Sequence, residues 1–345
     1  MWEKVPFICL IIPLSIVTFW AQDKDKMVIS TDILPFIESF INAIVSYVAY
    51  LGKIFWPVNL AVFYPFEYSM PLWKVLISAI ILIAITLVVL YYIKKLPFLF
   101  VGWFWYLGTL VPVIGLVKAG TQAIADRYTY LPSIGITMML LWGIPLLFPR
   151  EGTRKKIIFP AGVVFLTILA VLTWQQCGYW KNGIELFSHA LQITKNNAMV
   201  HNNRGITYEK LGQHQLAIND YNEAIILEPD YAIAYYNRGC AYDNLRQPQR
   251  AVKDYNEAIR LKPDYAKAYY NRGTIYGKYG KHQNAIFDFN QAISLKPNDA
   301  DAYNNRGMVY LNQGNNELGC VDAQKACAMG ICNALEMAKG KGLCR

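Results

Sequence analysis

The tripeptide Asn-Arg-Gly occurs four times in this chain of 345 residues, and each occurrence begins 34 residues after the one before it. The first residues of the four tripeptides are Asn203, Asn237, Asn271 and Asn305. Three prolines, Pro229, Pro263 and Pro297, keep the same interval. A period of this length predicts a stack of helical hairpins, since no single hairpin can bury its apolar face alone.

The pattern inside each period is typical of tetratricopeptide repeats (TPRs). A tyrosine follows each glycine by three residues, and alanines and an aromatic residue recur further along. Glycine and alanine allow two antiparallel helices to approach closely, and the proline ends the second helix. We therefore expect an α-solenoid over residues 179–331, with a half repeat at 180–195, three full repeats and a capping repeat at 298–331. Residues 332–345 are expected to form a cysteine-containing tail.

The first half of the chain has a different composition, with long apolar runs separated by short charged loops. Charged residues make up 17% of the whole sequence, whereas soluble domains are about a quarter charged. Five runs are long enough to cross a bilayer, which takes roughly 17–25 residues. They are residues 5–20, 73–93, 97–117, 131–148 and 157–176. We expect an all-α protein, with a multi-span transmembrane helical domain over residues 1–178 followed by the TPR α-solenoid.

A sixth apolar stretch, residues 36–56, carries polar residues on one helical side. Glu38, Asn42, Ser46 and Lys53 recur there at helical spacing among large apolar residues. An amphipathic helix of this kind is suited to lying in the membrane interface. The alternative is a sixth span whose polar side turns toward the other helices.

Basic residues flank the apolar runs and predict the orientation of the chain. Lys94 and Lys95 follow the second run, and a basic cluster from Arg150 to Lys156 lies between the fourth and the fifth. Because Lys and Arg are enriched in cytoplasmic loops, we expect both clusters in the cytoplasm. The repeats then lie on the other side, which for an integral protein of a bacterial inner membrane is the periplasm. This placement also explains the net charge of +9 without nucleic acid as a partner.

The asparagine of each tripeptide is a candidate for binding a peptide. We expect the first helices of stacked repeats to line a concave groove, with Asn203, Asn237, Asn271 and Asn305 in one column. Side-chain amides donate to and accept from an extended backbone without reading its sequence. The column resembles the asparagine ladder in the TPR superhelix of O-GlcNAc transferases, which implies an extended peptide or protein as partner. The alternative is that these amides cap turns or join neighbouring repeats.

Two segments of the first half carry a family resemblance. One runs from Ser46 through Trp56-Pro57 to Pro65, and the other is Ala-Asp-Arg-Tyr-Thr-Tyr-Leu-Pro at 125–132. Together with the repeats, these segments resemble the transmembrane-and-TPR O-mannosyltransferase family and its bacterial homologues. The resemblance implies a GT-C glycosyltransferase that uses a polyprenyl-phosphate-linked sugar as donor.

The same resemblance bears on catalysis. The family carries its catalytic acidic pair in the first extracytoplasmic loop, and Asp23, Asp25 and Asp32 after the first run do not resemble that pair. We therefore assign no catalytic residue and expect this chain to be the C-terminal part of such an enzyme. Its main expected function is that of a membrane-anchored scaffold for protein–protein interaction. The alternatives are an O-glycosyltransferase whose acidic loop comes from an upstream catalytic segment, and a structural subunit of a membrane complex.

Asp126, Arg127 and Lys118 are candidates for holding a lipid phosphate at the bilayer surface. A guanidinium can bind a phosphate through two parallel hydrogen bonds, and Lys118 is close in sequence to Arg127. The alternative is an ion pair between Asp126 and Arg127 that fixes the loop.

Four of the seven cysteines lie near the C-terminus, namely Cys320, Cys327, Cys332 and Cys344. Disulfides are permitted on the extracytoplasmic side, so a bridge among these four would staple the terminal cap. The alternative is a set of small buried residues and a loose thiol in the tail. The cysteine spacing is not that of a zinc site, and the four histidines form no constellation with a nucleophile. We therefore expect no metal and no cofactor.

Overall fold

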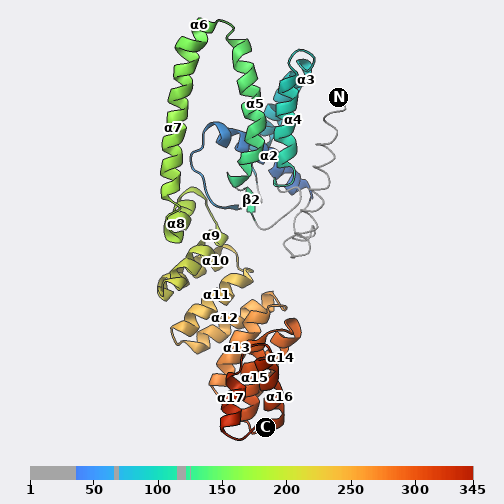
Figure 1. Cartoon of the computed structure of the whole chain (residues 1–345), viewed down its shortest axis with the longest axis vertical. Coiled ribbons are helices and arrows are strands. Elements are labelled where there is room, and N and C mark those ends of the chain that lie inside the picture. Colours follow the sequence, from blue (N-terminus) through green and yellow to red (C-terminus); the bar gives the residue numbers. More distant parts are fainter. Residues whose placement is uncertain (1–35, 66–69, 115–121, 125, 345) are drawn as a thin grey trace. The chain divides into compact units, whose positions relative to one another are not determined.

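The computed structural model of the chain describes residues 36–65, 70–114, 122–124 and 126–344. The contacts divide the chain into two compact units, residues 1–197 and 198–345. Figure 1 shows that both units are built mainly from helices. The division falls after the predicted half repeat at 180–195, so this segment groups with the first unit.

The first unit contains helices and one short two-stranded sheet. Its elements are α2 (Phe36–Phe55), β1 (Tyr64–Pro65), α3 (Leu72–Tyr91), α4 (Pro97–Leu110), β2 (Gln122–Ile124), the 3-10 helix η2 (Asp126–Thr129), α5 (Tyr130–Leu147), α6 (Glu151–Thr153), the π-helical turn η3 (Arg154–Ile158), α7 (Phe159–Gly178) and α8 (Gly183–Ile193). Strands β1 and β2 pair antiparallel. Strand β1 ends the first segment that carries the family resemblance, and β2 comes directly before the second in sequence.

Three of the described helical segments are long and apolar enough to cross a membrane. They are Leu72–Tyr91, Tyr130–Leu147 and the continuous stretch Glu151–Gly178. They coincide with the predicted runs 73–93, 131–148 and 157–176. The fourth apolar helix, Pro97–Leu110, is shorter than its predicted run of 97–117.

The predicted run at 5–20 lies outside the described residues.

The core of the first unit packs large aromatic side chains from α2 and α4, with Tyr50, Trp103 and Tyr106 almost fully buried. Helices α4 and α5 touch at a pair of glycines. A Cβ on Gly102 would stand 2.5 Å from the carbonyl oxygen of Gly135, so the two backbones can meet only because neither residue has a side chain.

Helix α2 buries part of its polar side. An interfacial helix would present its polar side to water, yet Asn42 and Ser46 are almost fully buried, while Ile37 and Phe40 on other sides are exposed. The Asn42 amide nitrogen and the Ser46 hydroxyl have no hydrogen-bond partner within the described part of the chain. The polar side therefore turns into the protein, as the alternative reading requires. Whether α2 crosses a membrane stays a prediction.

The second unit is a regular series of helical hairpins. Its helices are α9 (Ala198–Lys210), α10 (His214–Leu227), α11 (Ala232–Asn244), α12 (Pro248–Leu261), α13 (Ala266–Lys278), α14 (His282–Leu295), α15 (Ala300–Asn312), α16 (Asn316–Ala328) and α17 (Asn333–Gly340). The glycine of each tripeptide lies where the two helices of a hairpin touch. A Cβ on Gly239 would stand 2.7 Å from the ring of Tyr255, which is itself almost fully buried. The glycine therefore allows the two helices of the hairpin to approach closely, as the sequence predicts.

The turns between the two helices of each hairpin share one backbone feature. Gly212, Gly280 and Gly314 have φ angles of 73°, 72° and 79°, in the left-handed region that favours glycine. The equivalent residue of the second repeat is Arg246, which adopts a φ of 59° despite its side chain. The second repeat therefore carries backbone strain that the others avoid.

The C-terminal segment is more ordered than the predicted tail. Residues 333–340 form helix α17, and its first turn is capped by the buried Asn304, whose Oδ1 accepts a hydrogen bond from Ala334 N at 3.0 Å. Ala334 follows Ala300, the first residue of α15, by one repeat length. Helix α17 thus stands in the sequence register of another first helix and covers the end of the array.

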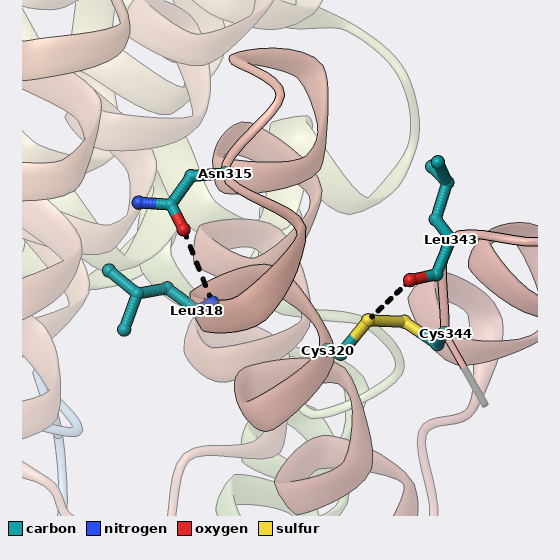
Figure 2. The surroundings of a disulfide bond; sticks show 5 residues. All are labelled: Asn315, Leu318, Cys320, Leu343 and Cys344. Atoms are coloured by element: carbon teal, nitrogen blue, oxygen red, sulfur yellow. Dashed lines mark hydrogen bonds between the residues drawn. A yellow bond between two sulfur atoms is a disulfide. The ribbon is translucent and has the colours of Figure 1, made fainter.

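Two disulfides tie this end together in the structure. Cys320 pairs with Cys344 and Cys327 pairs with Cys332, with Cα–Cα distances of 5.6 Å and 4.1 Å. Figure 2 shows the first bridge, with the Cys320 sulfur 3.4 Å from the carbonyl oxygen of Leu343. Because Cys320 lies in α16 and Cys344 follows α17, the bridge joins α16 to the segment after α17, and Cys344 belongs to the same buried cluster as Leu311.

Candidate functional site

The asparagines of the repeated tripeptide form a row along the first helices of the repeats. Asn237 Nδ2 donates to Oδ1 of Asn202, at 2.8 Å. Asn271 and Asn305 donate in the same way to the hydroxyls of Tyr236 and Tyr270, at 3.2 Å and 3.0 Å. Each of these three bonds joins one first helix to the first helix of the preceding repeat.

The observed bonds are those of the alternative reading, in which the amides join neighbouring repeats, and peptide binding by the row stays a prediction. The amides of Asn237, Asn271 and Asn305 do join neighbouring repeats, yet all three residues remain partly exposed. Asn203 begins the row, is also partly exposed and makes no side-chain hydrogen bond within the described residues. Because the bonds fix the amides in place, the row forms a preorganised set of polar groups.

A second column, which the sequence analysis missed, holds each hairpin together. Arg238 donates from Nε and Nη2 to the two carboxylate oxygens of Asp254, each at 2.7 Å. The Asp254 side chain is only 5% exposed, so the pair is a buried, bidentate ion pair. The same pair recurs in the other repeats as Arg204–Asp220, Arg272–Asp288 and Arg306–Asp322.

The arginine column also joins consecutive repeats. Arg238 Nη1 donates to the Oδ1 of Asn222, which belongs to the second helix of the repeat before it, and Arg272 bonds Asn256 in the same way. The signal for this network was available in the sequence, since the four aspartates share the 34-residue period. The arginine of the tripeptide is therefore a structural residue whose charge is neutralised inside the array.

Aromatic side chains gather next to the asparagine row between the second and third repeats. The ring of Tyr236 lies 4.9 Å from that of Tyr265 and 5.9 Å from that of Tyr255. Asn271 Nδ2 and the Tyr255 hydroxyl both lie 3.4 Å from the Cys240 sulfur. Burial raises the pKa of the Cys240 thiol, so it stays protonated at neutral pH and acts as a packing group rather than a nucleophile.

A separate polar cluster lies in the first unit, where the two resemblance segments meet. Asp126 accepts hydrogen bonds from Lys53 Nζ at 2.6 Å, from the Tyr64 hydroxyl at 2.9 Å and from Ala61 N at 3.0 Å. Lys53 also stands 3.5 Å from the centroid of the Tyr64 ring. Burial and the neighbouring Asp126 both raise the pKa of Tyr64, so its hydroxyl remains a donor. The cluster fixes the loop after α2 against η2.

Of the three residues of the predicted phosphate site, the structure describes only the side chain of Asp126. Asp126 pairs with Lys53, and both oxygens of its carboxylate accept hydrogen bonds within the described part of the chain. Arg127 lies in η2, but its side chain is outside the described residues, as is Lys118. Phosphate binding by Arg127 and Lys118 stays a prediction, and Asp126 is a positioning group in this structure. Within the described part of the chain, no group of His, Cys, Asp and Glu could hold a metal ion.

Comparison with known proteins matches the second unit. A family model described as tetratricopeptide repeat matches residues 198–231, 232–265 and 266–299, and a second model of the same description matches 289–320. These segments are tetratricopeptide repeats. The 34-residue period was therefore assigned correctly from sequence.

Two curated relatives are similar over a short segment. The human protein O-mannosyl-transferase TMTC4 is 34% identical over 85 residues, and the Caenorhabditis elegans protein O-mannosyl-transferase F38B6.6 is 28% identical over 83 residues. Each match covers 24% of this chain and 11% of the relative. The chain thus matches about a tenth of either protein's length.

Solved TPR structures are also similar. The crystal structure of MamA is 30% identical, with 46% of this chain and 89% of that chain covered and a TM-score of 0.40. The first TPR of Spaghetti (RPAP3), bound to an HSP90 peptide, is 29% identical, with 34% and 94% covered and a TM-score of 0.34.

Proposed function

We propose that this protein is a membrane-anchored scaffold whose TPR groove holds an extended polypeptide on the extracytoplasmic side. The observation that carries the proposal is the row of partly exposed amides on successive first helices. Amides at a regular interval suit the regular donors and acceptors of an extended backbone. The row includes Asn203, Asn237, Asn271 and Asn305.

Three further observations support the anchoring and the orientation. Three helical segments are long and apolar enough to cross a membrane, and they expose large apolar side chains such as Trp73, Leu87 and Leu166. The two disulfides at the end of the array favour an oxidising compartment, because cytosolic thiols are kept reduced. The basic loops between the apolar runs point to the same orientation.

Peptide binding is tested with the Asn203→Ala variant of the full chain in lipid nanodiscs. Asn203 is the best choice, because its side chain has no hydrogen bond to lose among the described residues. The variant should therefore keep its fold and bind extended peptides more weakly, by about 1 kcal/mol for one hydrogen bond. Unchanged affinity in fluorescence anisotropy for every peptide that the unaltered chain binds would refute a role for the row.

The orientation is tested by labelling a cysteine introduced in place of Lys281, an exposed residue in the turn after α13. A membrane-impermeant maleimide should reach this cysteine in intact spheroplasts. Labelling that requires permeabilised membranes would place the array in the cytoplasm instead.

The second candidate function is protein O-glycosyl transfer from a polyprenyl-phosphate-linked sugar. It is favoured by the family resemblance of the two segments that meet at Asp126, and by the similarity to two protein O-mannosyl-transferases. On this reading the repeats present the acceptor polypeptide, and the acidic catalytic loop comes from an upstream segment. A transfer assay with the chain in proteoliposomes tests it. Sugar transfer by this chain alone would show that it is more than a scaffold.

A further inference from the structure

We propose that the occupant of the TPR groove is an uncharged, proline-rich segment in the polyproline II conformation. This inference rests on the proposed function and names the chemical class of its partner. Three observations support it. The side chains along the asparagine row are uncharged, its amides retain N–H donors, and tyrosine rings lie beside it.

The side chains that make the contacts along the row are uncharged in every repeat. They are the tripeptide asparagine, the residue before it and the residue three positions after it, as the bonds of Asn202, Tyr236 and Cys240 show. None of these three positions carries Lys, Arg, Asp, Glu or His in any of the four repeats. The arginine that follows each row asparagine is paired with a buried aspartate, and further charged residues lie about a turn or more away, such as Lys267 before Asn271 and Glu209 after Asn203. A strongly charged peptide would therefore lose its hydration along the row and gain no counter-charge.

The nearest arginines cannot serve as a clamp for carboxylates. Arg204, Arg238, Arg272 and Arg306 directly follow the row asparagines in sequence, but each is paired with a buried aspartate. Recruiting Arg238, Arg272 or Arg306 to a ligand would leave its aspartate buried without a cation, which is strongly unfavourable. An acidic peptide is therefore a poor match for the centre of the groove.

The amides of the row favour a backbone that offers carbonyl groups. One N–H of Asn237 Nδ2 donates to Asn202 in the preceding repeat, which leaves the second N–H as a donor for a ligand. The same holds for Asn305, whose Oδ1 accepts from Asn304 and is therefore occupied. A polyproline II chain has no internal hydrogen bonds, and its prolines have carbonyls but no N–H. Its backbone thus supplies the acceptors that these donors need.

The tyrosines supply the apolar surface for such a ligand. Tyr236 and Tyr265 are partly exposed, and their rings lie 4.9 Å apart at an angle of 40°. Ile233 is exposed one turn before Tyr236 on the same helix. Proline rings pack against aromatic-lined grooves, and little conformational entropy is lost because the segment is already extended.

The experiment measures fluorescence anisotropy with the full chain in nanodiscs and three labelled peptides of equal length. The first is an uncharged peptide of Pro, Ser and Thr, the second has Ala in place of each Pro, and the third has Asp in place of each Ser. The proline peptide should bind at least about tenfold more tightly than either of the others. Equal or tighter binding of the acidic or the proline-free peptide would overturn this inference and leave the proposed function intact. Absence of binding by all three would overturn the proposed function as well.

A charge introduced in the row gives a second measurement. Thr274→Lys places a cation three residues after Asn271, at an exposed position. It should weaken binding of the proline peptide and raise the affinity for the acidic one by about tenfold. Ser294→Lys is the matched control, because it adds the same charge at an exposed position of a second helix. An equal response of the two variants would show that the peptide does not lie along the row.

Discussion

The buried ion pair between Arg238 and Asp254 should stabilise the second repeat by a measurable and separable amount. In the Arg238→Met variant the apolar stem of the side chain is kept, but Asp254, 5% exposed, remains as a buried carboxylate without a cation. Removal of one partner of such a pair costs about 3–5 kcal/mol, and the lost hydrogen bond to Asn222 adds about 1 kcal/mol. Each 1.4 kcal/mol is a factor of ten in an equilibrium constant, so opening should increase by at least a hundredfold.

Hydrogen exchange of the full chain, read by mass spectrometry over α11 and α12, measures this effect locally. Arg260→Met is the matched control, because the Arg260–Glu257 pair in α12 has the same chemistry but side chains that are 65% and 37% exposed. Such a surface pair contributes at most about 1 kcal/mol, so exchange should change little.

The double variant Arg238→Met/Asp254→Leu separates the charge from the packing. If the cost of the single change comes from the unpaired carboxylate, the second change should recover most of it, since apolar replacement of a buried pair is often neutral. Two results would refute the reasoning. One is a cost below about 1 kcal/mol for Arg238→Met, and the other is a double variant as unstable as the single one.

Three further predictions concern the stability of the same array. Arg246→Gly should stabilise the second repeat by about 0.5–1 kcal/mol, because φ is 59° there, whereas Arg246→Ala should not; thermal unfolding distinguishes the two. Gly239→Ala should destabilise it by about 1–3 kcal/mol through overpacking, while Gly340→Ala, with no atom within 4 Å of its Cβ, should be neutral or stabilising in urea titrations. Burial raises the pKa of Asp220, but hydrogen bonds from Arg204 and His201 lower it by more, so the pKa lies below its usual value. Its stabilisation should thus be present above about pH 4 and be lost as the pH falls through the lower folded pKa, and Asp220→Asn should flatten this dependence in hydrogen exchange over α9 and α10.

The repeats could be predicted from sequence because the information is periodic. A residue such as Gly205 recurs at a fixed interval, and both its partner and its steric role recur with it. The Arg–Asp column carries the same period, and it was missed because the spacing of 16 between Arg204 and Asp220 has meaning only once two helices are folded against each other.

The first unit could be predicted only in outline. Hydropathy located three of the long apolar helices, because length and composition alone decide that property. It could not decide which side of α2 faces the protein, since an apolar side can meet either lipid or core. The contact of Lys53 with Asp126 spans 73 residues and has no local signal.

Helix α17 could not be predicted from sequence for a related reason. Eight residues of ordinary composition carry little helical signal by themselves, and α17 is held by the Asn304 cap and by the Cys320–Cys344 bridge, both distant in sequence. The bonds that join the amides of neighbouring repeats depend on how the repeats stack, so the sequence alone could not predict them.

Site-specific photo-crosslinking tests the central claim most directly. A benzophenone amino acid is placed at position 203, at the start of the asparagine row, or at position 294, on an exposed second helix, in the full chain in its membrane. If the groove holds an extended polypeptide, irradiation should attach the bound peptide at position 203 and not at position 294. Crosslinks only at 294, or equal yields at both positions, would contradict the assignment of the asparagine row as the peptide-binding site.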